Sequence, residues 1–465
     1  MPDVSAAIDL SSPRRIHVAG VCGTGMSAYA LVLAQAGHRV TGSHESASPV
    51  AERLRAAGVQ VFVGHTAANL PADVELVAAS TSSGPDHVEL VEARRRGVPV
   101  LRRAELLAAL CSQRRAIAVT GTHGKTTTTA LTALALRGGL RHPSFVVGAD
   151  VPSLDHGAWW DERDDLFVVE ADESDATFLE LPRVLGVVTS LEADHLATYG
   201  GTLAGLEAAF ERFVAETAGP VLLDVDDPGA RRLRGSRRAV VTYGQSPESD
   251  FRIVDVRQHR LHSTFALLHP GGTTGVRLPV PGAYNVANAA AAIAAAVLVG
   301  CDPDRAAGAL AGYGGVRRRF EQRGEALGAT IVDDFAHLPG EVAAVLAAAK
   351  EGGWDRVVAV FQPHRYSRTE ELHREFAGAF DQADVLIVAG IYGAGEHPRP
   401  GVTGSLIAEA SGHRALTYVE ERAELAGVVA EHLRPGDLLL TIGAGDVTDL
   451  ADELEATPAS GSPMR

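Results

Sequence analysis

Cysteine is scarce in this sequence. Its 465 residues contain only three cysteines, Cys22, Cys111 and Cys301, which lie far apart and form no CxxC pair. A disulfide framework or a cysteine zinc site needs more cysteines at closer spacing. We therefore expect three reduced thiols, as in a cytoplasmic protein.

Basic residues are outnumbered by acidic ones. The chain has 42 Lys and Arg against 58 Asp and Glu, a formal net charge of −16. So acidic a protein is repelled by polyanions, which argues against nucleic acid or an anionic membrane as its main partner.

The sequence also lacks a long hydrophobic run. The longest alanine-rich stretch, Ala289 to Val299, is too short to span a bilayer, and residues 1–12 lack the basic and apolar segments of a signal peptide. We expect a cytoplasmic protein with no membrane insertion. Only the two ends, up to about Pro13 and after about Glu455, have the Ser, Pro and Ala content typical of disordered tails.

One stretch, TGTHGKTTTT from Thr120 to Thr129, has the features of a phosphate-binding loop. An apolar run over 116–119 predicts a strand before it, and an apolar run over 130–136 predicts a helix after it. Backbone N–H groups at such a turn bind phosphate oxygens, Lys125 can neutralise the outer phosphates, and the Thr126 hydroxyl can ligate magnesium. The spacing GxxGKT is shorter than the common GxxxxGKT, and the alternative is a glycine turn with a solvated lysine. The predicted nucleotide-binding residues are Gly121, Thr122, His123, Gly124, Lys125, Thr126 and Thr127.

A second glycine-rich turn lies near the N-terminus. A predicted strand over 15–19 leads into Gly20 to Ser27, a helix that ends near Gly37 and a second strand over 39–41. This βαβ pattern is typical of diphosphate binding, although tight helix–strand packing remains an alternative. The spacing GxxGxG does not fit the dinucleotide fingerprint, and Ser43 and His44 stand where an NAD-binding acid is expected, so hydride transfer is the weaker interpretation. Further strands over 60–63, 74–79 and 98–100 predict an open α/β sheet to about residue 112.

Acidic and imidazole groups follow two predicted strands of the central region. The strand over 166–169 ends in EADESD from Glu170, and the strand over 185–189 leads to Glu192 and His195. Such ends can converge on a metal beside a phosphate loop in a parallel sheet. Glu170 and His195 are the preferred ligands. Solvated turns, helix caps and a structurally satisfied histidine are the alternatives.

Two asparagines precede a helix that is apolar on nearly every face and must be buried. Asn285 and Asn288 lie on one side of its first turns, where amides can recognise an adenine edge, and capping explains Asn285 equally well. The glycine- and arginine-rich stretch 312–320 then indicates a domain boundary.

A second α/β sheet is predicted beyond that boundary. Strands are expected over 331–334, 356–361, 384–389 and 437–442. Two of these strands are followed by stretches whose side chains can bind ligands or transfer protons. The first runs from Asp333 to His337. The second contains His364 with Arg365 and Arg368, which can clamp a carboxylate or phosphate bidentately. A solvated basic loop is the alternative.

These motifs together resemble the Mur ligases in order and spacing over about residues 15–450. The resemblance implies an α/β protein of three domains. They are a Rossmann-like UDP-binding domain at 1–112, a central P-loop ATPase domain at 113–315 and a Rossmann-like C-terminal closing domain at 316–465. It also implies an ATP-dependent ligation in which the γ-phosphoryl group activates a carboxylate and an amine attacks the acyl phosphate. UDP-N-acetylmuramate and L-alanine are the implied substrates, ATP and Mg²⁺ the cofactors, and a monomer or weak homodimer the implied state.

The resemblance also implies roles for individual residues. Lys125, His337, Arg365 and Arg368 would be catalytic. Thr126, Glu170 and His195 would hold Mg²⁺. Asn285, Asn288, Arg319 and Asp334 would join the phosphate loop in holding ATP. The implied substrate-binding residues are Gly20, Gly23, Gly25, Met26, Ser27, Ser43, His337, His364, Arg365 and Arg368.

Several positions depart from the family pattern, mostly on the UDP and acceptor sides. They are Cys22, Thr24, His44, Ala197, Tyr284, Phe335, Leu338 and Gly340. Substrate identity is therefore less constrained than reaction type. Two alternatives stay open: a Mur-type ligase that joins another amino acid or a peptide, and a non-catalytic nucleotide-binding regulator, against which the intact Lys125, Glu170 and His195 argue.

Overall fold

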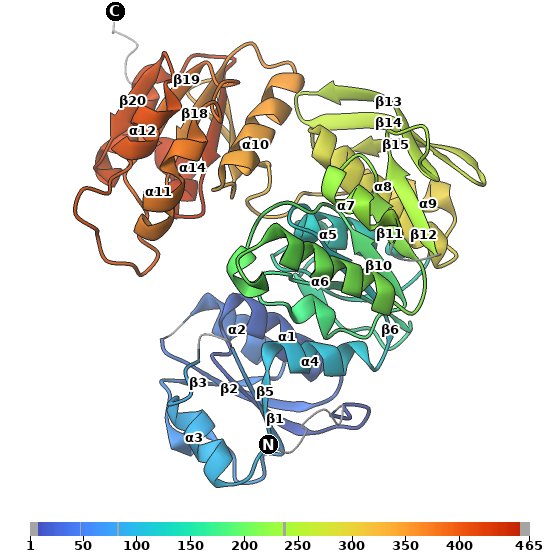
Figure 1. The fold of residues 1–465 in the computed structure, drawn as a ribbon. Helices are drawn as coiled ribbons and strands as arrows, with labels where there is room; N and C mark the ends of the chain where they lie inside the picture. The colour runs from blue at the N-terminus through green and yellow to red at the C-terminus, as the bar shows by residue number, and fades with distance from the viewer. Residues whose placement is uncertain (1–7, 47, 81–82, 236–238, 456–465) are drawn as a thin grey trace, which may run out of the picture. The chain divides into compact units, whose positions relative to one another are not determined.

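The computed structural model describes residues 8–46, 48–80, 83–235 and 239–455. The predicted disordered tails therefore lie largely outside the described residues. The chain forms two compact units, residues 1–255 with 265–276 and 287–314, and residues 256–264 with 277–286 and 315–465. Three β-sheets follow one another along the chain (Figure 1).

The first sheet is parallel and has the strand order β3-β2-β1-β4-β5. Its strands are β1 Arg15–Ala19, β2 Arg39–His44, β3 Gln60–Val63, β4 Leu76–Ala79 and β5 Val100–Arg102. The helices between and after them are α1 Thr24–Gln35, α2 Pro49–Ala56, α3 Val88–Arg95 and α4 Arg103–Cys111. A central β1 flanked by β2 and β4 places the turn after β1 at the point where the strand order reverses, the usual ligand position in such sheets.

The second sheet has ten strands in the order β15-β14-β13-β12-β11-β10-β6-β9-β7-β8. The strands are β6 Arg115–Thr120, β7 Ser144–Val146, β8 Ala158–Trp159, β9 Leu166–Glu170, β10 Leu185–Val188, β11 Val221–Asp224, β12 Val240–Gly244, β13 Phe251–His259, β14 His262–His269 and β15 Gly272–Leu278. The helices are α5 Lys125–Gly138, α6 Leu203–Glu216, α7 Pro228–Arg232, α8 Ala283–Leu298 and α9 Pro303–Leu310. β6 pairs in parallel with β9 and β10, so the phosphate loop and both acidic strand ends share one edge of the sheet.

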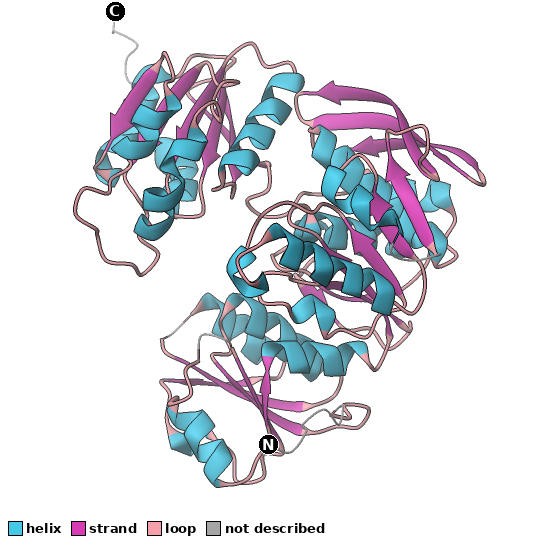
Figure 2. Cartoon of the chain, in the orientation of Figure 1, coloured by secondary structure: helices cyan, strands magenta, loops and turns pink. Residues whose placement is uncertain are grey.

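The third sheet has the order β16-β17-β21-β18-β19-β20, parallel except for the hairpin of β16 and β17. Its strands are β16 Glu321–Ala326, β17 Ala329–Asp334, β18 Val357–Phe361, β19 Val385–Ala389, β20 Leu416–Val419 and β21 Leu438–Ile442. The helices are α10 Pro339–Glu351, α11 Tyr366–Leu372, α12 Ser405–Ser411, α13 Leu425–His432 and α14 Leu450–Glu455. Helices and strands alternate within this region (Figure 2).

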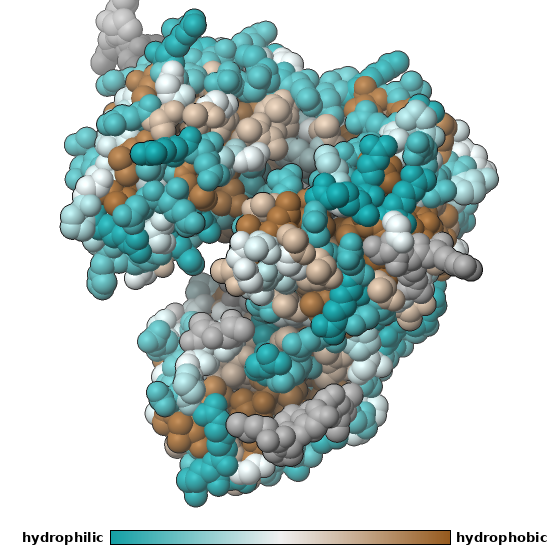
Figure 3. Space-filling view, viewed as in Figure 1, coloured by the Kyte–Doolittle hydropathy of each residue, from teal (hydrophilic) through white to brown (hydrophobic). Residues whose placement is uncertain are grey.

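The cores explain why these segments fold as they do. In the first unit, one cluster of buried apolar side chains includes Val18 beneath the first sheet and Phe167 and Phe213 around the second. In the second unit, apolar side chains cover both faces of the sheet, as the continuous apolar strands require. Hydrophilic groups are spread over the surface in view (Figure 3).

The α/β class and the main parallel strands are confirmed. The predicted all-round burial of the alanine-rich helix is also confirmed, because Ala289 to Ala296 are fully buried in α8. The domain limits at 112 and 315 stay predictions. One placement was wrong: the second strand continues through Ser43 and His44 instead of ending at residue 41, because these residues pair with Phe62 and Val63 of β3. Among the described residues, no helix is both long and apolar enough to cross a membrane.

Candidate active site

The loop between β6 and α5 is shaped by two glycines with positive φ, Gly121 at +134° and Gly124 at +80°. A side chain at Gly121 would collide with the Thr189 hydroxyl, and a Cβ at Gly124 would lie 2.5 Å from Asn288 Oδ1. Both positions therefore need glycine for conformation and for space. The loop leads directly into the first turn of α5, so its N–H groups and the positive end of the helix face the same place.

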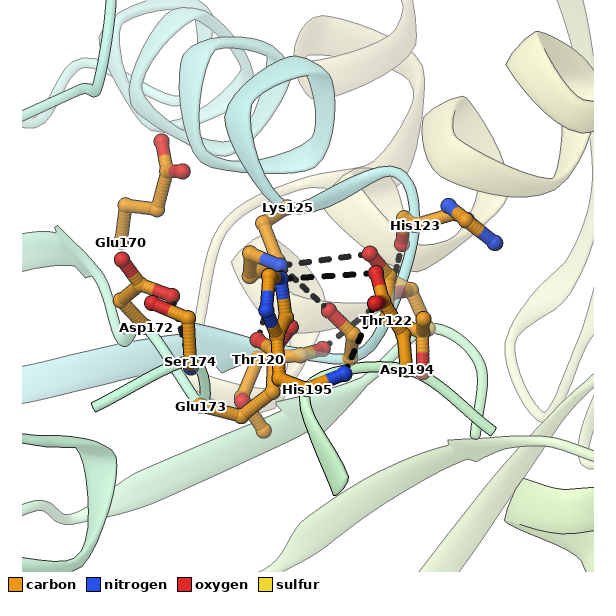
Figure 4. Close-up of polar contacts among 12 residues, drawn as sticks. Thr120, Thr122, His123, Lys125, Glu170, Asp172, Glu173, Ser174, Asp194 and His195 are labelled. Atoms are coloured by element: carbon orange, nitrogen blue, oxygen red, sulfur yellow. Dashed lines mark hydrogen bonds and ion pairs between the residues drawn. The ribbon is translucent and has the colours of Figure 1, made fainter. Parts of the chain in front are cut away.

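Lys125 is held inside this loop. Its Nζ donates to the carbonyls of Gly121 at 2.8 Å and Thr122 at 3.3 Å, and it lies 2.8 Å from Glu173 Oε2 (Figure 4). The Lys125 side chain is 14% exposed and that of Glu173 only 2%. The amine is thus fixed where the phosphates of a nucleotide would approach the loop.

Burial and mutual attraction shift the pKa values of both partners. Burial raises the pKa of Glu173 to about 7, and the charge and hydrogen bond of Lys125 only partly oppose that rise. For Lys125, burial favours the neutral amine, but the charge of Glu173 outweighs it and raises the lysine pKa. Lys125 is therefore cationic at neutral pH, and Glu173 is the group that titrates there.

Thr126 and Glu170 form the hard-oxygen part of the site. The Thr126 hydroxyl donates to Glu170 Oε1 at 3.0 Å, while Glu170 Oε2 accepts from the Gly148 N–H at 2.8 Å. A hydroxyl and a carboxylate held side by side are ligands that suit Mg²⁺, so these residues fit the expected ion.

His195 lies at the end of the loop that follows β10. Its φ is +50°, its side chain is 43% exposed, and its Nε2 lies 3.4 Å from Asp194 Oδ2. The exposed imidazole is accessible to an ion, and its role as a ligand remains a prediction.

The remaining nucleotide-side residues make structural contacts. The His123 N–H donates to Ser190 Oγ at 2.9 Å, and its ring points away from Lys125 (Figure 4). Thr127 is buried in α5. The Asn288 amide oxygen accepts from Thr128 at 3.0 Å, which ties the start of α8 to α5.

Asn285 lies within the first turn of α8, so it is not the residue that precedes and caps the helix. Its Nδ2 donates to the Pro281 carbonyl at 2.7 Å. This contact fixes the amide at the beginning of α8 and leaves its oxygen as an acceptor.

The N-terminal turn lies between β1 and α1. Gly20 has φ of +73°, and the Val21 N–H donates to the Ser43 carbonyl at 2.9 Å. Met26 is buried beneath the turn, Gly23 caps α1, and Gly25 leaves space beside Arg103. Ser27 follows in the first turn of α1, its N–H donating to the Gly23 carbonyl.

Ser43 is fully buried, and its hydroxyl donates to Glu89 Oε2 at 2.5 Å. Sequence reasoning predicted that Ser43 contacts substrate. The hydroxyl is engaged inside the sheet, and the role of Ser43 in substrate binding stays a prediction.

Two residues in or beside the acidic stretch after β9, Arg103 and Glu173, were not singled out from the sequence. Arg103 at the start of α4 lies 3.2 Å from Asp172 and 3.6 Å from Asp175, in the acidic stretch after β9. Glu173 of the same stretch is the partner of Lys125. The cluster of acids in EADESD was the available signal, but a sequence does not tell which acid faces which base.

The second unit carries its own polar group at the ends of β17 and β18. Asp334 is buried, and its carboxylate accepts from the N–H groups of Phe320 at 2.7 Å and Ala336 at 2.8 Å. Burial, opposed by the Arg319 charge, raises its pKa to about 6. The Arg319 guanidinium lies 5.4 Å from the centre of the Phe335 ring.

Two imidazoles and an arginine meet nearby. The rings of His337 and His364 lie 5.8 Å apart, and Arg368 Nη1 lies 3.1 Å from His364 Nδ1. Burial, the charge of His337 and the arginine charges lower the pKa of His364 to about 4, and burial lowers that of His337. Arg365 immediately precedes α11 and has φ of +73°. At neutral pH the group thus combines neutral imidazoles with fixed cations, a combination suited to anions.

Comparison with known proteins settles the family. Residues 15–115 match the Mur ligase family, catalytic domain; residues 119–296 match the Mur ligase middle domain; residues 318–445 match the Mur ligase, glutamate ligase domain. The chain belongs to the Mur ligase family. The three-domain α/β architecture expected of a Mur ligase is confirmed.

Similar Mur ligases cover nearly the whole chain. The "UDP-N-acetylmuramate--L-alanine ligase" of Sinorhizobium fredii is 42% identical over 96% of this chain and 98% of its own length. The protein of the same name from Thermobifida fusca is 41% identical, over 96% and 97%. Among solved structures, the UDP-N-acetylmuramate-alanine ligase MurC of Thermotoga maritima has a TM-score of 0.80 at 30% identity, over 95% of this chain and 98% of that one.

Proposed function

We propose that this Mur ligase joins L-alanine to the lactyl carboxylate of UDP-N-acetylmuramate at the expense of ATP, a step of peptidoglycan precursor synthesis. The observation that carries the proposal is the phosphate loop with its largely buried Lys125, in a chain that is similar over about 95% of its length to ligases of that name. The protein would act in the cytoplasm, as a monomer or weak homodimer.

The chemistry begins with a poor electrophile. A carboxylate must be activated, and transfer of the γ-phosphoryl group gives an acyl phosphate with a good leaving group. The amine of L-alanine then attacks the acyl carbon, and phosphate leaves. The protein's contribution is positioning and charge neutralisation.

Lys125 is the residue best placed to serve the transferring group. Its ammonium is oriented by two loop carbonyls and by the Glu173 carboxylate, which a phosphate oxygen would replace as its anionic partner. The N–H groups of Gly121 to Thr127 would surround the phosphates, and Asn285, Asn288, Arg319 and Asp334 would complete the ATP site.

Thr126, Glu170 and His195 would hold the magnesium ion. When bound, it would neutralise phosphate charge and orient the oxygens. The Thr126 hydroxyl and the Glu170 carboxylate lie 3.0 Å apart, which supports this assignment.

On the substrate side, the turn from Gly20 to Ser27 would carry the UDP diphosphate on its N–H groups. His337, His364, Arg365 and Arg368 would bind the sugar-linked carboxylate and stabilise the charge that develops on it. The neutral imidazole of His364 beside a fixed guanidinium supports that role.

Mass spectrometry of the product formed from UDP-N-acetylmuramate, ATP, Mg²⁺ and a mixture of amino acids tests the proposal. We expect one product, heavier than the substrate by one alanine residue. A product that carries another amino acid or a peptide would favour the first alternative, a Mur-type ligase of other specificity. No product, with nucleotide still bound, would favour a regulator.

A further inference from the structure

A histidine and carboxylate cluster lies in the N-terminal domain, away from the phosphate loop in the sequence. His65 follows β3, His87 precedes α3, and Glu89 belongs to the first turn of α3. One ligand atom from each of the three side chains lies within 4.8 Å of the other two. The cluster combines two imidazoles with one carboxylate.

His87 is the residue that the rest of the fold does not explain. Both of its ring nitrogens are buried and have no hydrogen-bond partner among the described residues. Its ring instead meets the edge of the His65 ring, with centroids 4.5 Å apart. A buried polar group without a partner usually marks a missing ligand or water.

Hydrogen bonds hold Glu89 in its ionised form. Its side chain is fully buried, and its oxygens accept from Ser43 at 2.5 Å, Asn69 at 2.8 Å and His17 at 3.2 Å. Burial alone would raise its pKa, but these hydrogen bonds outweigh burial and bring the pKa to about 2. Ser43 and His17 contact Oε2 and Asn69 contacts Oε1, so Oε1 keeps one lone-pair position for a further partner.

The two histidines bring ring nitrogens to the cluster in different states: both nitrogens of His87 lack a partner among the described residues, whereas His65 Nδ1 is engaged by Ser43. His65 Nδ1 lies 2.8 Å from the Ser43 hydroxyl and 3.8 Å from Glu89 Oε2, and its side chain is 24% exposed. Burial and the neighbouring His65 lower the pKa of His87, which keeps its imidazole neutral with a lone pair available. An ion could therefore approach the cluster past the partly exposed His65 ring.

We propose that His65, His87 and Glu89 form a binding site for a divalent transition-metal ion of the zinc type. Two imidazole nitrogens and one carboxylate oxygen are a common zinc ligand set, with water in the fourth position. Zinc bonds of about 2.0–2.1 Å would draw the three atoms closer together than they lie here, by rotation of the two imidazole rings. His17, Asn69 and Ser43 already orient the carboxylate from behind, as outer partners do in such sites.

This site is distinct from the magnesium site in chemistry and position in the fold. The oxygens of Thr126 and Glu170 belong to the second sheet and suit a hard cation, whereas imidazoles favour zinc, nickel or copper. Millimolar Mg²⁺ should therefore occupy the former and not compete at the latter.

The test is a zinc titration of the full-length protein, stripped with a chelator and kept in millimolar Mg²⁺, followed by calorimetry and by competition with a chromophoric chelator. We expect one tight Zn²⁺ per chain. His87→Gln and, separately, His65→Gln should each weaken that site at least tenfold. His262→Gln is the matched control, since His262 stacks on His259 with centroids 4.2 Å apart and lies outside the cluster.

Three further measurements distinguish loss of the site from poor folding of a variant. Circular dichroism compares the folds of all three variants, and Co²⁺ added to the wild-type protein should give the visible absorption of a low-symmetry nitrogen and oxygen site. Zinc should also raise the thermal midpoint of the wild type but not of His87→Gln. Absence of tight binding in the wild type, or equal binding by a folded His87→Gln, would overturn the proposal.

Discussion

Lys125 Nζ lies 2.8 Å from Glu173 Oε2 at the N-terminal end of α5, and both side chains are largely buried. The phosphate-binding lysine is thus neutralised by a carboxylate before a nucleotide arrives. Binding of a triphosphate must compete with that carboxylate for the ammonium.

Lys125→Met should lower the rate of ligation by at least about 100-fold, because it removes the cation that meets the transferring phosphoryl group. Phosphate release measured with saturating substrates gives the rate, and circular dichroism checks the fold. Lys350→Met is the control, since Lys350 makes only a half-exposed ion pair with Asp384. A turnover within twofold of wild type would refute the assignment of the loop.

Glu173→Gln should change how ATP binding depends on pH. As pH rises through about 7, Glu173 loses its proton, its negative charge engages Lys125 more strongly, and ATP affinity should fall. The KM for ATP of the wild type should therefore rise severalfold more between pH 6 and pH 8 than that of the variant. Parallel profiles would show that Glu173 does not titrate in this range.

Thr126→Val keeps the shape of the side chain and removes the hydroxyl that contacts Glu170. We expect the Mg²⁺ concentration for half-maximal activity to rise about tenfold, since one hard-oxygen ligand is lost. Thr132→Val is the matched control: the Thr132 hydroxyl only donates to the Thr128 carbonyl further along α5. Equal magnesium curves for the two variants would argue against Thr126 as a ligand.

His195→Ala should raise the magnesium requirement more than the KM for the amino acid, because its exposed ring is predicted to bind the ion. Both constants come from the same phosphate-release assay, so the amino-acid KM is an internal control. If only the amino-acid KM changed, His195 would belong to the acceptor site instead.

Phe335→Tyr with Leu338→His restores polar groups at two positions that depart from the family pattern. The centre of the Phe335 ring lies 5.0 Å from the Arg318 guanidinium and 5.4 Å from that of Arg319, and Leu338 immediately precedes α10. Added hydrogen-bonding groups should sharpen the preference for L-alanine over glycine and L-serine, or tighten UDP-N-acetylmuramate binding. Competition between the amino acids measures the acceptor preference. The KM for ATP shows whether nucleotide binding changes. A change in ATP affinity alone would exclude these residues from the acceptor site.

The sequence alone determined the class of fold and the location of the phosphate loop. Apolar runs of strand length, each followed by glycine or by acids, predict parallel strands with chemistry at their carboxyl ends. β6, β9 and β10 lie within two residues of the predicted limits because this signal is local.

Only the tertiary structure decided which polar groups meet. Glu173 faces Lys125, Arg103 faces Asp172, and His87 faces His65, because strand order brings together segments that are far apart in the chain. It also placed Ser43 inside the first sheet, where pairing of β2 with β3 extends the strand beyond its apolar part. Backbone pairing and burial across distant segments are cooperative, so no local pattern encodes them.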